Sequence, residues 1–408
     1  MSRCNCARGA FFLVLPCLCL CHSAWAVENS SRTAALESIT TEEVKTHIDA
    51  LADDTFEGRE SGSRGGRAAA TYIVRSLKKC GYHGAAPKDS FYQNFRDYHN
   101  ILTQVEGRDP QLKDQFIVIG AHYDHVGYGS ALNSYGPLGK IHNGADDNAS
   151  GVAALLEVAE ALSRLAEPPR RSVLIAFWDG EEKGLLGSEY WAAHPTVPLG
   201  HVPIVINADM VGRLRAKLEI FGSRTSVGLR KLVSRQNEVP QLPIDFNWQM
   251  KPDSDHHSFF KRDIPILMFF TGMHGDYHRP SDDADKINTT GVQHVAQLMF
   301  GVLVELADAP DLGSFRRRSK SESRVDQEQR EIPLPQLPGR LGITWSEEAA
   351  KKGEIIVATV ALGSAAERAG IRRGDRITQF AGHDVHGAAA FRLMVVAAQN
   401  PVAAVLRR

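Results

Sequence analysis

Three apolar segments of this chain end directly on histidine or carboxylate side chains. The first ends on His122 and Asp124, the second on Glu181 and Glu182, and the third on Asp209. In an open α/β sheet, ligands bind outside the carboxyl ends of the strands, so residues at these ends converge from distant parts of the sequence. Carboxylates beside buried strands are costly unless a positive charge lies among them, and a divalent metal ion supplies that charge. The pattern therefore predicts a metal site at one edge of a sheet.

The spacing of apolar residues predicts an α/β fold. Between residues 100 and 287, apolar runs rich in β-branched residues alternate with helical patterns, which favours a mixed, mostly parallel β-sheet flanked by helices. Amphipathic helices are expected at 41–51 and 65–80, and a further helix at 292–307 closes the domain. We therefore expect one α/β domain over residues 27–309.

Composition excludes several classes of protein. The 408 residues suggest two or three domains. With 43% hydrophobic residues, 23% charged residues and a formal net charge of −1, the chain resembles neither a disordered protein nor a nucleic-acid binder. We expect no nucleic-acid partner.

The first 26 residues predict a cleavable signal peptide. Arg3 and Arg8 precede the apolar run 11–21, and Ala24-Trp25-Ala26 forms an A-x-A cleavage pattern. The run is shorter than the ~20 residues that span a bilayer, so we expect no transmembrane anchor and a secreted or periplasmic protein. A lipoprotein signal is the weaker alternative, because the residues before the leader cysteines are not small. Cleavage would leave Cys80 as the one cysteine.

A second, smaller domain is expected at the C-terminus. Residues 310–338 are polar and punctuated by proline, which is typical of a linker. The remaining segment, 339–408, is too short for another α/β domain but long enough for a compact β-rich module.

Further candidate ligands lie in two loops. Asp146, Asp147 and Asn148 precede a helix that starts near residue 149, where capping explains one of them but not all three. Tyr277 and His278 follow another apolar strand. Zinc accepts imidazole nitrogen and carboxylate oxygen, and five such ligands suit two ions that share one carboxylate. Histidine is a poor ligand for calcium. Chemistry alone does not decide between Asp146 and Asp147, or between Glu181 and Glu182.

Five motifs in order resemble the M28 family of zinc aminopeptidases. They are H-x-D at 122–124, GADDNASG at 144–151, DGEEKGLLGS at 179–188, NADMVGR at 207–213 and YHRPSDD at 277–283. The resemblance covers roughly residues 40 to 308. The sequence contains neither an H-E-x-x-H helix nor a G-x-S-x-G elbow, which removes common zincin and serine-hydrolase alternatives. It also leaves no room for an inserted protease-associated domain.

The resemblance implies a role for each candidate. His122 and Asp209 would hold one zinc ion, Glu182 and His278 the other, and Asp147 would bridge them; the family register decides both open choices. Glu181 would be the general base, taking a proton from water and passing it to the leaving amine. Asp124 would support the His122 ring, and Tyr277 would help to stabilise the oxyanion. Other residues near these motifs are expected to support the cleft rather than bind metal: His125, His142, Asp253, Asp255, His256, His257 and His274.

The C-terminal segment resembles a PDZ domain of the kind found in bacterial envelope proteases. The resemblance rests on GRLGITW at 339–345 and on residues 363–382. It implies that Leu341, Gly342 and Ile343 form the loop that receives the terminal carboxylate of a peptide. This loop reads R-L-G-I rather than G-L-G-F, and a folded spacer without a ligand is the alternative.

Together these features predict a secreted aminopeptidase with two zinc ions, acting on peptides with a free N-terminus, and a module that binds a peptide or protein C-terminus. A carboxypeptidase, a dipeptidase or a glutaminyl cyclase would fit the same fold. A catalytically silent binding protein is disfavoured, because every ligand and the base are present.

Overall fold

The computed structural model describes residues 30–331, 341–397 and 403–407. The expected signal peptide lies outside these residues. The chain divides into two compact units, one up to Gln327 and one from Glu328. No helix among the described residues combines the length and apolar character needed to cross a bilayer.

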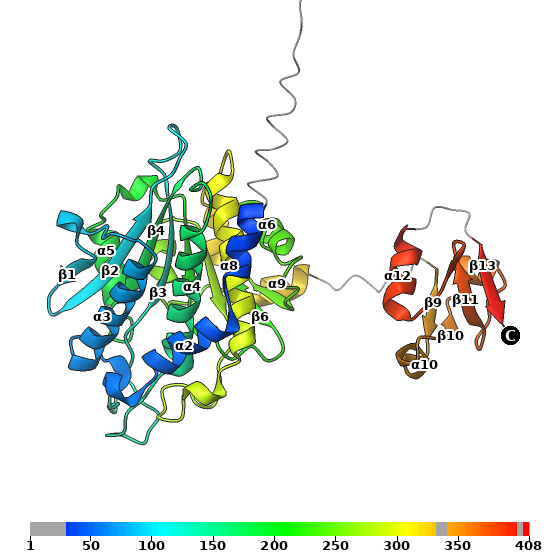
Figure 1. Cartoon of the computed structure of the whole chain (residues 1–408), viewed down its shortest axis with the longest axis horizontal. Coiled ribbons are helices and arrows are strands. Elements are labelled where there is room, and N and C mark those ends of the chain that lie inside the picture. Colours follow the sequence, from blue (N-terminus) through cyan, green and yellow to red (C-terminus); the bar gives the residue numbers. More distant parts are fainter. Residues whose placement is uncertain (1–29, 332–340, 398–402, 408) are drawn as a thin grey trace, which may run out of the picture. The chain divides into compact units, whose positions relative to one another are not determined.

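The first unit is built on an eight-stranded sheet in the order β1-β2-β4-β3-β5-β8-β6-β7 (Figure 1). The strands are β1 (Tyr92–Phe95), β2 (Tyr98–Val105), β3 (Phe116–His122), β4 (Ser172–Trp178), β5 (Ile204–Ala208), β6 (Leu218–Phe221), β7 (Ile244–Asn247) and β8 (Ile266–Phe270). The central strands β4, β3, β5 and β8 run parallel, while β1, β2 and β6 pair antiparallel with their neighbours towards the centre. The predicted mixed, mostly parallel sheet is confirmed.

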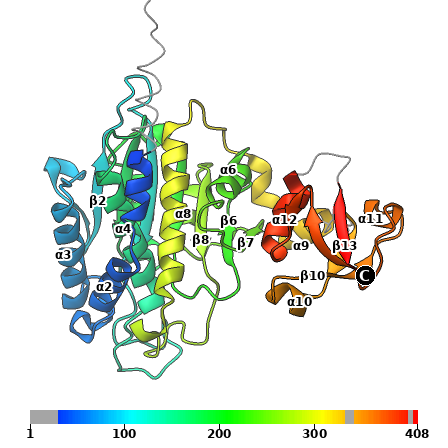
Figure 2. The ribbon, with the colours of Figure 1, turned by 45° about the vertical axis from the view of Figure 1, so that its right-hand side comes forward.

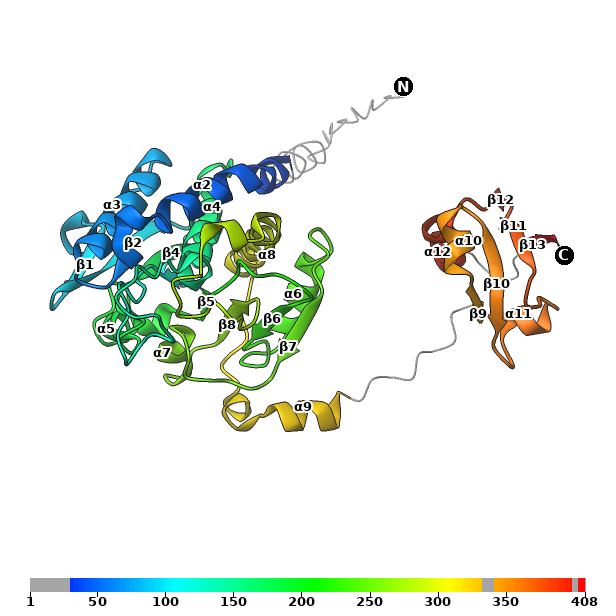
Figure 3. The same cartoon turned by 90° about the horizontal axis from the view of Figure 1, so that it is seen from below.

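Helices cover both faces of this sheet. They are α2 (Thr41–Leu51), α3 (Arg64–Lys79), α4 (Gly151–Ser163), α5 (Leu186–Ala193), α6 (Leu229–Gln236), α7 (His256–Phe260) and α8 (Thr289–Asp308). One core packs α2, α3, α4 and α8 on the sheet, and α4 and α8 lie side by side there (Figure 2). A second core packs α5 and α7 on the opposite face (Figure 3). Because both faces are buried, the central strands read as continuous apolar runs.

Local signals set the helix boundaries. The hydroxyl of Thr40 caps α2 by accepting the N–H of Glu43, and Asn288 caps α8 by accepting the N–H of Gly291. The second cap explains why α8 begins three residues before the predicted start at 292. The parallel strands β3, β4, β5 and β8 all end at the same edge of the sheet, and this edge carries the predicted site residues.

The segment that follows α8 differs from the expected linker along much of its length. Residues 317–321 form a short 3₁₀ helix and α9 spans Arg324–Arg330. Glu322 is buried and accepts two hydrogen bonds of 2.8 Å from the guanidinium of Arg224, with Arg316 as a further partner. Burial raises the pKa of Glu322, but the two guanidinium groups outweigh it and lower the pKa to about 2. Residues up to Gln327 thus pack within the first unit, although their polar composition is typical of a linker.

The second unit is a small antiparallel β structure with its own core. Its elements are β9 (Ile343–Trp345), α10 (Glu347–Lys351), β10 (Ile355–Val360), α11 (Ala365–Arg368), β11 (Arg376–Phe380), β12 (His383–Asp384), α12 (Ala388–Ala397) and β13 (Ala404–Arg407). The core includes Ile355, Val357, Ile377, Phe380 and Phe391. This agrees with the predicted β-rich module.

The packed segment generates a stability prediction. A chain that ends at Arg330 keeps the Glu322 ion pairs and the hydrogen bonds that Gln327 makes with Phe246 and Trp248. Its thermal midpoint should stay within about 2 °C of the first unit's midpoint in the full chain. A chain that ends at Ser314 loses these contacts and should unfold at least ~4 °C lower by calorimetry. Equal midpoints would show that the segment adds no stability.

Candidate metal centre

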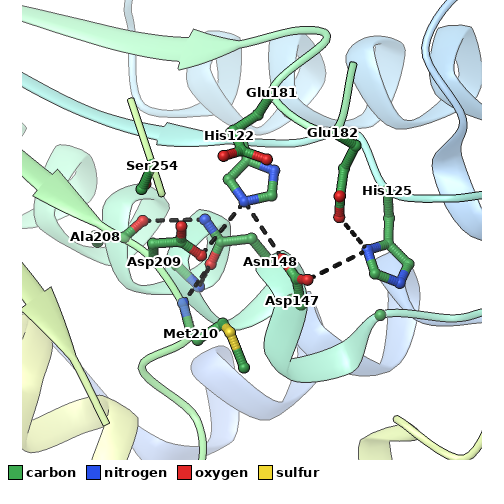
Figure 4. A network of polar contacts seen from close by, with 12 residues as sticks. His122, His125, Asp147, Asn148, Glu181, Glu182, Ala208, Asp209, Met210 and Ser254 are labelled. Atoms are coloured by element: carbon green, nitrogen blue, oxygen red, sulfur yellow. Dashed lines mark hydrogen bonds and ion pairs between the residues drawn. The ribbon is translucent and has the colours of Figure 1, made fainter. Parts of the chain in front are cut away.

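The predicted metal-site residues lie close together at the carboxyl edge of the sheet, and Figure 4 shows five of them: His122, Asp147, Glu181, Glu182 and Asp209. His122 is the last residue of β3, Asp209 follows β5, Glu181 and Glu182 follow β4, and His278 follows β8. Asp147 lies in a short helical turn, Ala145–Ser150, that leads into α4. Loops from four parallel strands and one helix start therefore meet at one place.

Asp147 lies at the centre of the cluster, and its two carboxylate oxygens face different partners. Oδ1 lies 3.3 Å from His122 Nε2, which is also 3.3 Å from Asp209 Oδ1. Oδ2 lies 3.1 Å from His278 Nε2, which is 3.0 Å from Glu182 Oε2. One carboxylate thus joins two groups, each with an imidazole and a further carboxylate.

The contacts among these side chains are better explained by metal binding than by hydrogen bonds between them. His278 Nε2 is buried and lies close to two carboxylate oxygens, yet it has no hydrogen-bond partner. Ligands about 2.1 Å from a tetrahedral zinc ion lie roughly 3.4 Å apart, close to the spacing found here. At this edge of the sheet, ligand atoms lie within 4.8 Å of one another in two groups: His122, Glu181 and Asp209, and His125, Asp147, Glu182 and His278. The residues present therefore fit two ions.

The pKa of Asp147 is lowered in this cluster, and the pKa values of His278 and Glu181 are raised. Burial raises the pKa of Asp147, but the neighbouring histidines His122, His278 and His125 outweigh it and hold the pKa well below its usual range. Burial lowers the pKa of His278, but the carboxylates of Asp147 and Glu182 raise it to about 10. Burial raises the pKa of Glu181 well above its usual range; Glu182 and Asp209 add to this rise, while His122 opposes it. The cluster attracts positive charge, and Glu181 binds a proton unusually well.

Asp124 supports the loop that carries both glutamates. Its Oδ1 accepts the backbone N–H of Glu181 at 3.1 Å. Its Oδ2 accepts the backbone N–H of Glu182 at 3.3 Å and the hydroxyl of Ser61 at 2.8 Å. The expected contact with His122 is longer, at 3.6 Å between Nδ1 and Oδ1. The carboxylate of Asp124 thus holds the loop after β4, while its carbonyl oxygen lies 3.2 Å from Nδ1 of the His122 ring.

The turn around Asp147 directs the two neighbouring aspartates to different partners. Asp146 points away from the cluster, and its Oδ1 accepts the N–H of Gly212 and the hydroxyl of Ser150. The side chain of Asn148 accepts the N–H of Gly151, which is the capping role considered for this turn. Asp147 alone of these three lies in the metal-ligand group.

A cavity of about 520 Å³ opens beside the cluster. Its polar side includes Asp147, Glu181, Asp209 and Tyr277. Apolar walls come from Met210, Phe221, Met268, Phe270 and Met273, and the remaining lining residues are Glu219, Asn247, Lys251 and Asp253. A side chain of moderate size can therefore lie next to the metal-ligand groups.

Comparison with known proteins identifies the first unit. Residues 100–303 match the model of peptidase family M28. The chain belongs to this family. Residues 331–399 match the PDZ domain, so the second resemblance is confirmed as well.

Individual relatives of the M28 unit are distant. The chain is 25% identical over 254 residues to leupeptin-inactivating enzyme 1 of Streptomyces exfoliatus, covering 61% of this chain and 53% of that protein. It is 26% identical over 272 residues to probable leucine aminopeptidase 2 of Aspergillus oryzae, covering 58% and 49%. The chain thus spans about half the length of these curated relatives.

Solved structures confirm the fold of the M28 unit. LapA aminopeptidase of Legionella pneumophila aligns with a TM-score of 0.55 at 19% identity, covering 71% of this chain and 76% of that one. Glutaminyl cyclase of Porphyromonas gingivalis also aligns with a TM-score of 0.55, at 21% identity, covering 65% and 98%. At these identities the likeness concerns the fold alone.

Two residues in or beside the metal-ligand groups, His125 and Arg59, were not among the predicted metal-site residues. Arg59 belongs to none of the five motifs. The side chain of His125 is fully buried, with Nδ1 2.9 Å from Glu182 Oε1 and 3.7 Å from Asp147 Oδ2, although a supporting role in a cleft loop was expected. Its place directly after Asp124, at a strand end, was a usable signal. His142 and His274 fit the expectation better, because they contact Ser134 and Asp146 respectively.

Arg59 holds the metal-site loops together. Its fully buried guanidinium donates to the carbonyl oxygens of Leu51 at 2.7 Å, Asn143 at 2.5 Å, Gly144 at 2.9 Å and Tyr123 at 3.0 Å. Burial lowers the pKa of Arg59 to about 10, while nearby carboxylates, Asp147 first among them, act in the opposite direction. Arg59 therefore stays charged at neutral pH and joins the loop after β3 to the turn that carries Asp147.

Replacing Arg59 should test this anchoring role. Arg59→Met keeps the length of the side chain but leaves five carbonyl groups, those named above and that of Asp147, without this donor, so the free energy of unfolding should fall by about 3 kcal/mol or more in urea. Arg67 is exposed and donates to one carbonyl, that of Gly62, so Arg67→Met should change it by at most about 0.5 kcal/mol. Similar losses in both variants would contradict the anchoring role.

Proposed function

We propose that this chain is a secreted aminopeptidase that uses two zinc ions to remove N-terminal residues from peptides. The observation that carries the proposal is the placement of Asp147, whose two oxygens face two histidine-containing groups. The names of the M28 relatives, leupeptin-inactivating enzyme and leucine aminopeptidase, support a peptidase activity. The apolar leader at residues 1–26 supports secretion.

His122 and Asp209 would hold one ion, Glu182 and His278 the other, and Asp147 would bridge them. Imidazole and carboxylate together favour zinc over calcium or magnesium. Zinc bound there would supply Lewis acidity, which acidifies water and polarises the carbonyl group of the scissile bond.

Glu181 is proposed as the general base. Its loop is fixed through the hydrogen bonds to Asp124, and its raised pKa suits a group that takes a proton from the attacking water and returns it to the leaving amine. Tyr277 lines the same cavity. Burial and nearby carboxylates raise the pKa of its phenol, which therefore stays protonated and can donate a hydrogen bond to the oxyanion.

The cavity supports removal of a terminal residue. Its apolar walls can accept a side chain, while the adjacent acids Glu181 and Asp209 can pair with a free α-amino group. A glutaminyl cyclase is an alternative because it can be built on the same fold, and that activity would need a single zinc ion. Zinc ions at both metal-ligand groups, together with cleavage of unblocked peptides, would favour the aminopeptidase over the cyclase.

The second unit is proposed to bind an extended peptide through Leu341, Gly342 and Ile343. Strand β9 pairs with β10 alone among the described strands, so its other edge offers backbone groups to an added strand. Gly342 has a φ of 79°, and a Cβ there would lie 2.1 Å from Ser364 Cβ, so the turn before β9 requires glycine.

Glu181→Gln should separate binding from chemistry. The amide keeps the shape of the side chain but cannot accept the proton, so both zinc ions should remain while kcat on aminoacyl amides falls by about 10²–10⁴-fold. The wild-type chain should cleave these amides but neither cleave N-blocked peptides nor cyclise N-terminal glutaminyl peptides. Undiminished turnover in the variant would remove Glu181 as the base.

Metal analysis of the purified protein should test the bridge. The wild-type chain should contain two zinc ions, and Asp147→Asn should weaken the binding of both. Asp146→Asn is the matched control, because the amide oxygen can still accept from Gly212, and it should keep both ions. Loss of one ion alone in the Asp147 variant would reject the bridging role.

The role of the second unit can be measured separately. The chain that ends at Arg330 should cleave aminoacyl amides as the full chain does, because the metal-ligand groups lie in the first unit. In fluorescence anisotropy, the full chain should bind peptides with a free C-terminus more tightly than their C-terminal amides. Equal binding of both forms would favour the folded-spacer interpretation.

A further inference from the structure

We propose that His125 is a third imidazole of the metal centre and binds the second ion through Nδ1, beside Asp147, Glu182 and His278. The inference rests on the proposed function, because it presupposes ions at both groups. It gives the two ions unequal surroundings: one imidazole in the group of His122, and two in the group of His278.

The position of the ring carries the inference. Nδ1 lies 2.9 Å from Glu182 Oε1 and 3.7 Å from Asp147 Oδ2. The same two carboxylates contact His278 Nε2, through Glu182 Oε2 at 3.0 Å and Asp147 Oδ2 at 3.1 Å. The rings of His125 and His278 approach edge to face, with centroids 5.5 Å apart. Figure 4 shows His125 facing Glu182 and Asp147 from the side opposite His122. Four donor residues thus each place a ligand atom within 4.8 Å of the other three, which is the arrangement expected of side chains that share one ion.

The backbone holds the ring in this position. The N–H of His125 donates to the carbonyl oxygen of Arg59, the same residue that anchors the Asp147 turn. On the opposite side, a Cβ at Gly144 would lie 2.4 Å from His125 Cδ2, so the ring packs directly against the glycine backbone. The side chain is fully buried, and Nε2 has no hydrogen-bond partner. The ring therefore has no room to turn away, and Nδ1 is the nitrogen that faces the acids.

A hydrogen bond from Nδ1–H to Glu182 is the competing role for the same contact. An asparagine at position 125 can replace the ring as a hydrogen-bond donor but not as a zinc ligand. The amide nitrogen of asparagine lies near the place of Nδ1 and can donate to Glu182, but it is not a zinc ligand of the imidazole kind. His125→Asn should therefore preserve metal binding if the ring only donates a hydrogen bond, and impair it if the ring is a ligand.

The experiment measures zinc retained by the full chain during titration with a chelator. The wild type should release two ions in separate steps. In His125→Asn we expect the second ion to bind more weakly by more than the roughly 10–100-fold that loss of an outer-shell partner costs, while the first ion is retained. His142→Asn is the matched control, since His142 is also buried in these loops but bonds to Ser134 and the carbonyl oxygen of Lys140, and it should keep both ions. Unchanged affinity in His125→Asn, or equal weakening of both ions, would overturn the proposal.

A measurement on the wild-type chain covers the case in which the variant does not fold. Long-range ¹H–¹⁵N correlation of the imidazole rings, recorded before and after zinc is added, should show His125 Nδ1 changing to a metal-bound nitrogen. A ring that keeps its proton on Nδ1 in the zinc-loaded protein would overturn the proposal. A wild-type chain that binds no second zinc ion would instead overturn the proposed function, so the two failures are distinguishable.

Discussion

The first unit depends on how its buried carboxylates are compensated. Asp147, Glu182 and Asp209 lie close together at the end of a sheet whose strands are apolar on both faces. Ionised carboxylates in such surroundings are unfavourable unless cations and hydrogen-bond donors are arranged around them. Imidazole rings supply part of this compensation, and the spacing of the donors leaves the rest to metal ions. The loops at this edge are shaped to meet that requirement.

The compensation extends beyond the proposed ligands. Backbone N–H groups of Asp146 and Asp147 donate to Asp282, which also accepts from Arg213. Asn148 accepts from Met210, directly after Asp209, and so ties the turn before α4 to the end of β5. Arg59 adds a buried positive charge whose donors bind carbonyl groups rather than carboxylates. The proposed ligands are therefore positioned mainly through hydrogen bonds between side chains of one loop and backbone groups of another.

Sequence reasoning recovered the parts of this arrangement that local pattern determines. Continuous apolar runs predicted the central strands, and acids at their ends predicted the edge on which Asp147, Glu182 and Asp209 meet. The family resemblance, rather than chemistry, selected Asp147 over Asp146, because both are acids in one turn and only the backbone of that turn directs one of them inward. Arg59 could not be predicted as a site residue, because its hydrogen-bond partners are backbone carbonyl groups, which do not depend on the side-chain sequence. Within the linker expected at 310–338, polar residues up to Gln327 pair with other residues of the first unit, as Glu322 does with Arg224, and this pairing could not be predicted from composition.

Part of the cavity wall belongs to strands that carry none of the proposed metal ligands. Phe221 on β6 lies opposite Met268 on β8, and Glu219 lies opposite Phe270, so the cavity is lined by two neighbouring antiparallel strands. The proposed ligands lie in loops after β3, β4, β5 and β8 and in the turn before α4. Substitutions on β6 can thus reshape the compartment that receives a side chain without disturbing the charge balance at Asp147. Selectivity can diverge among related chains while the reaction chemistry is inherited intact.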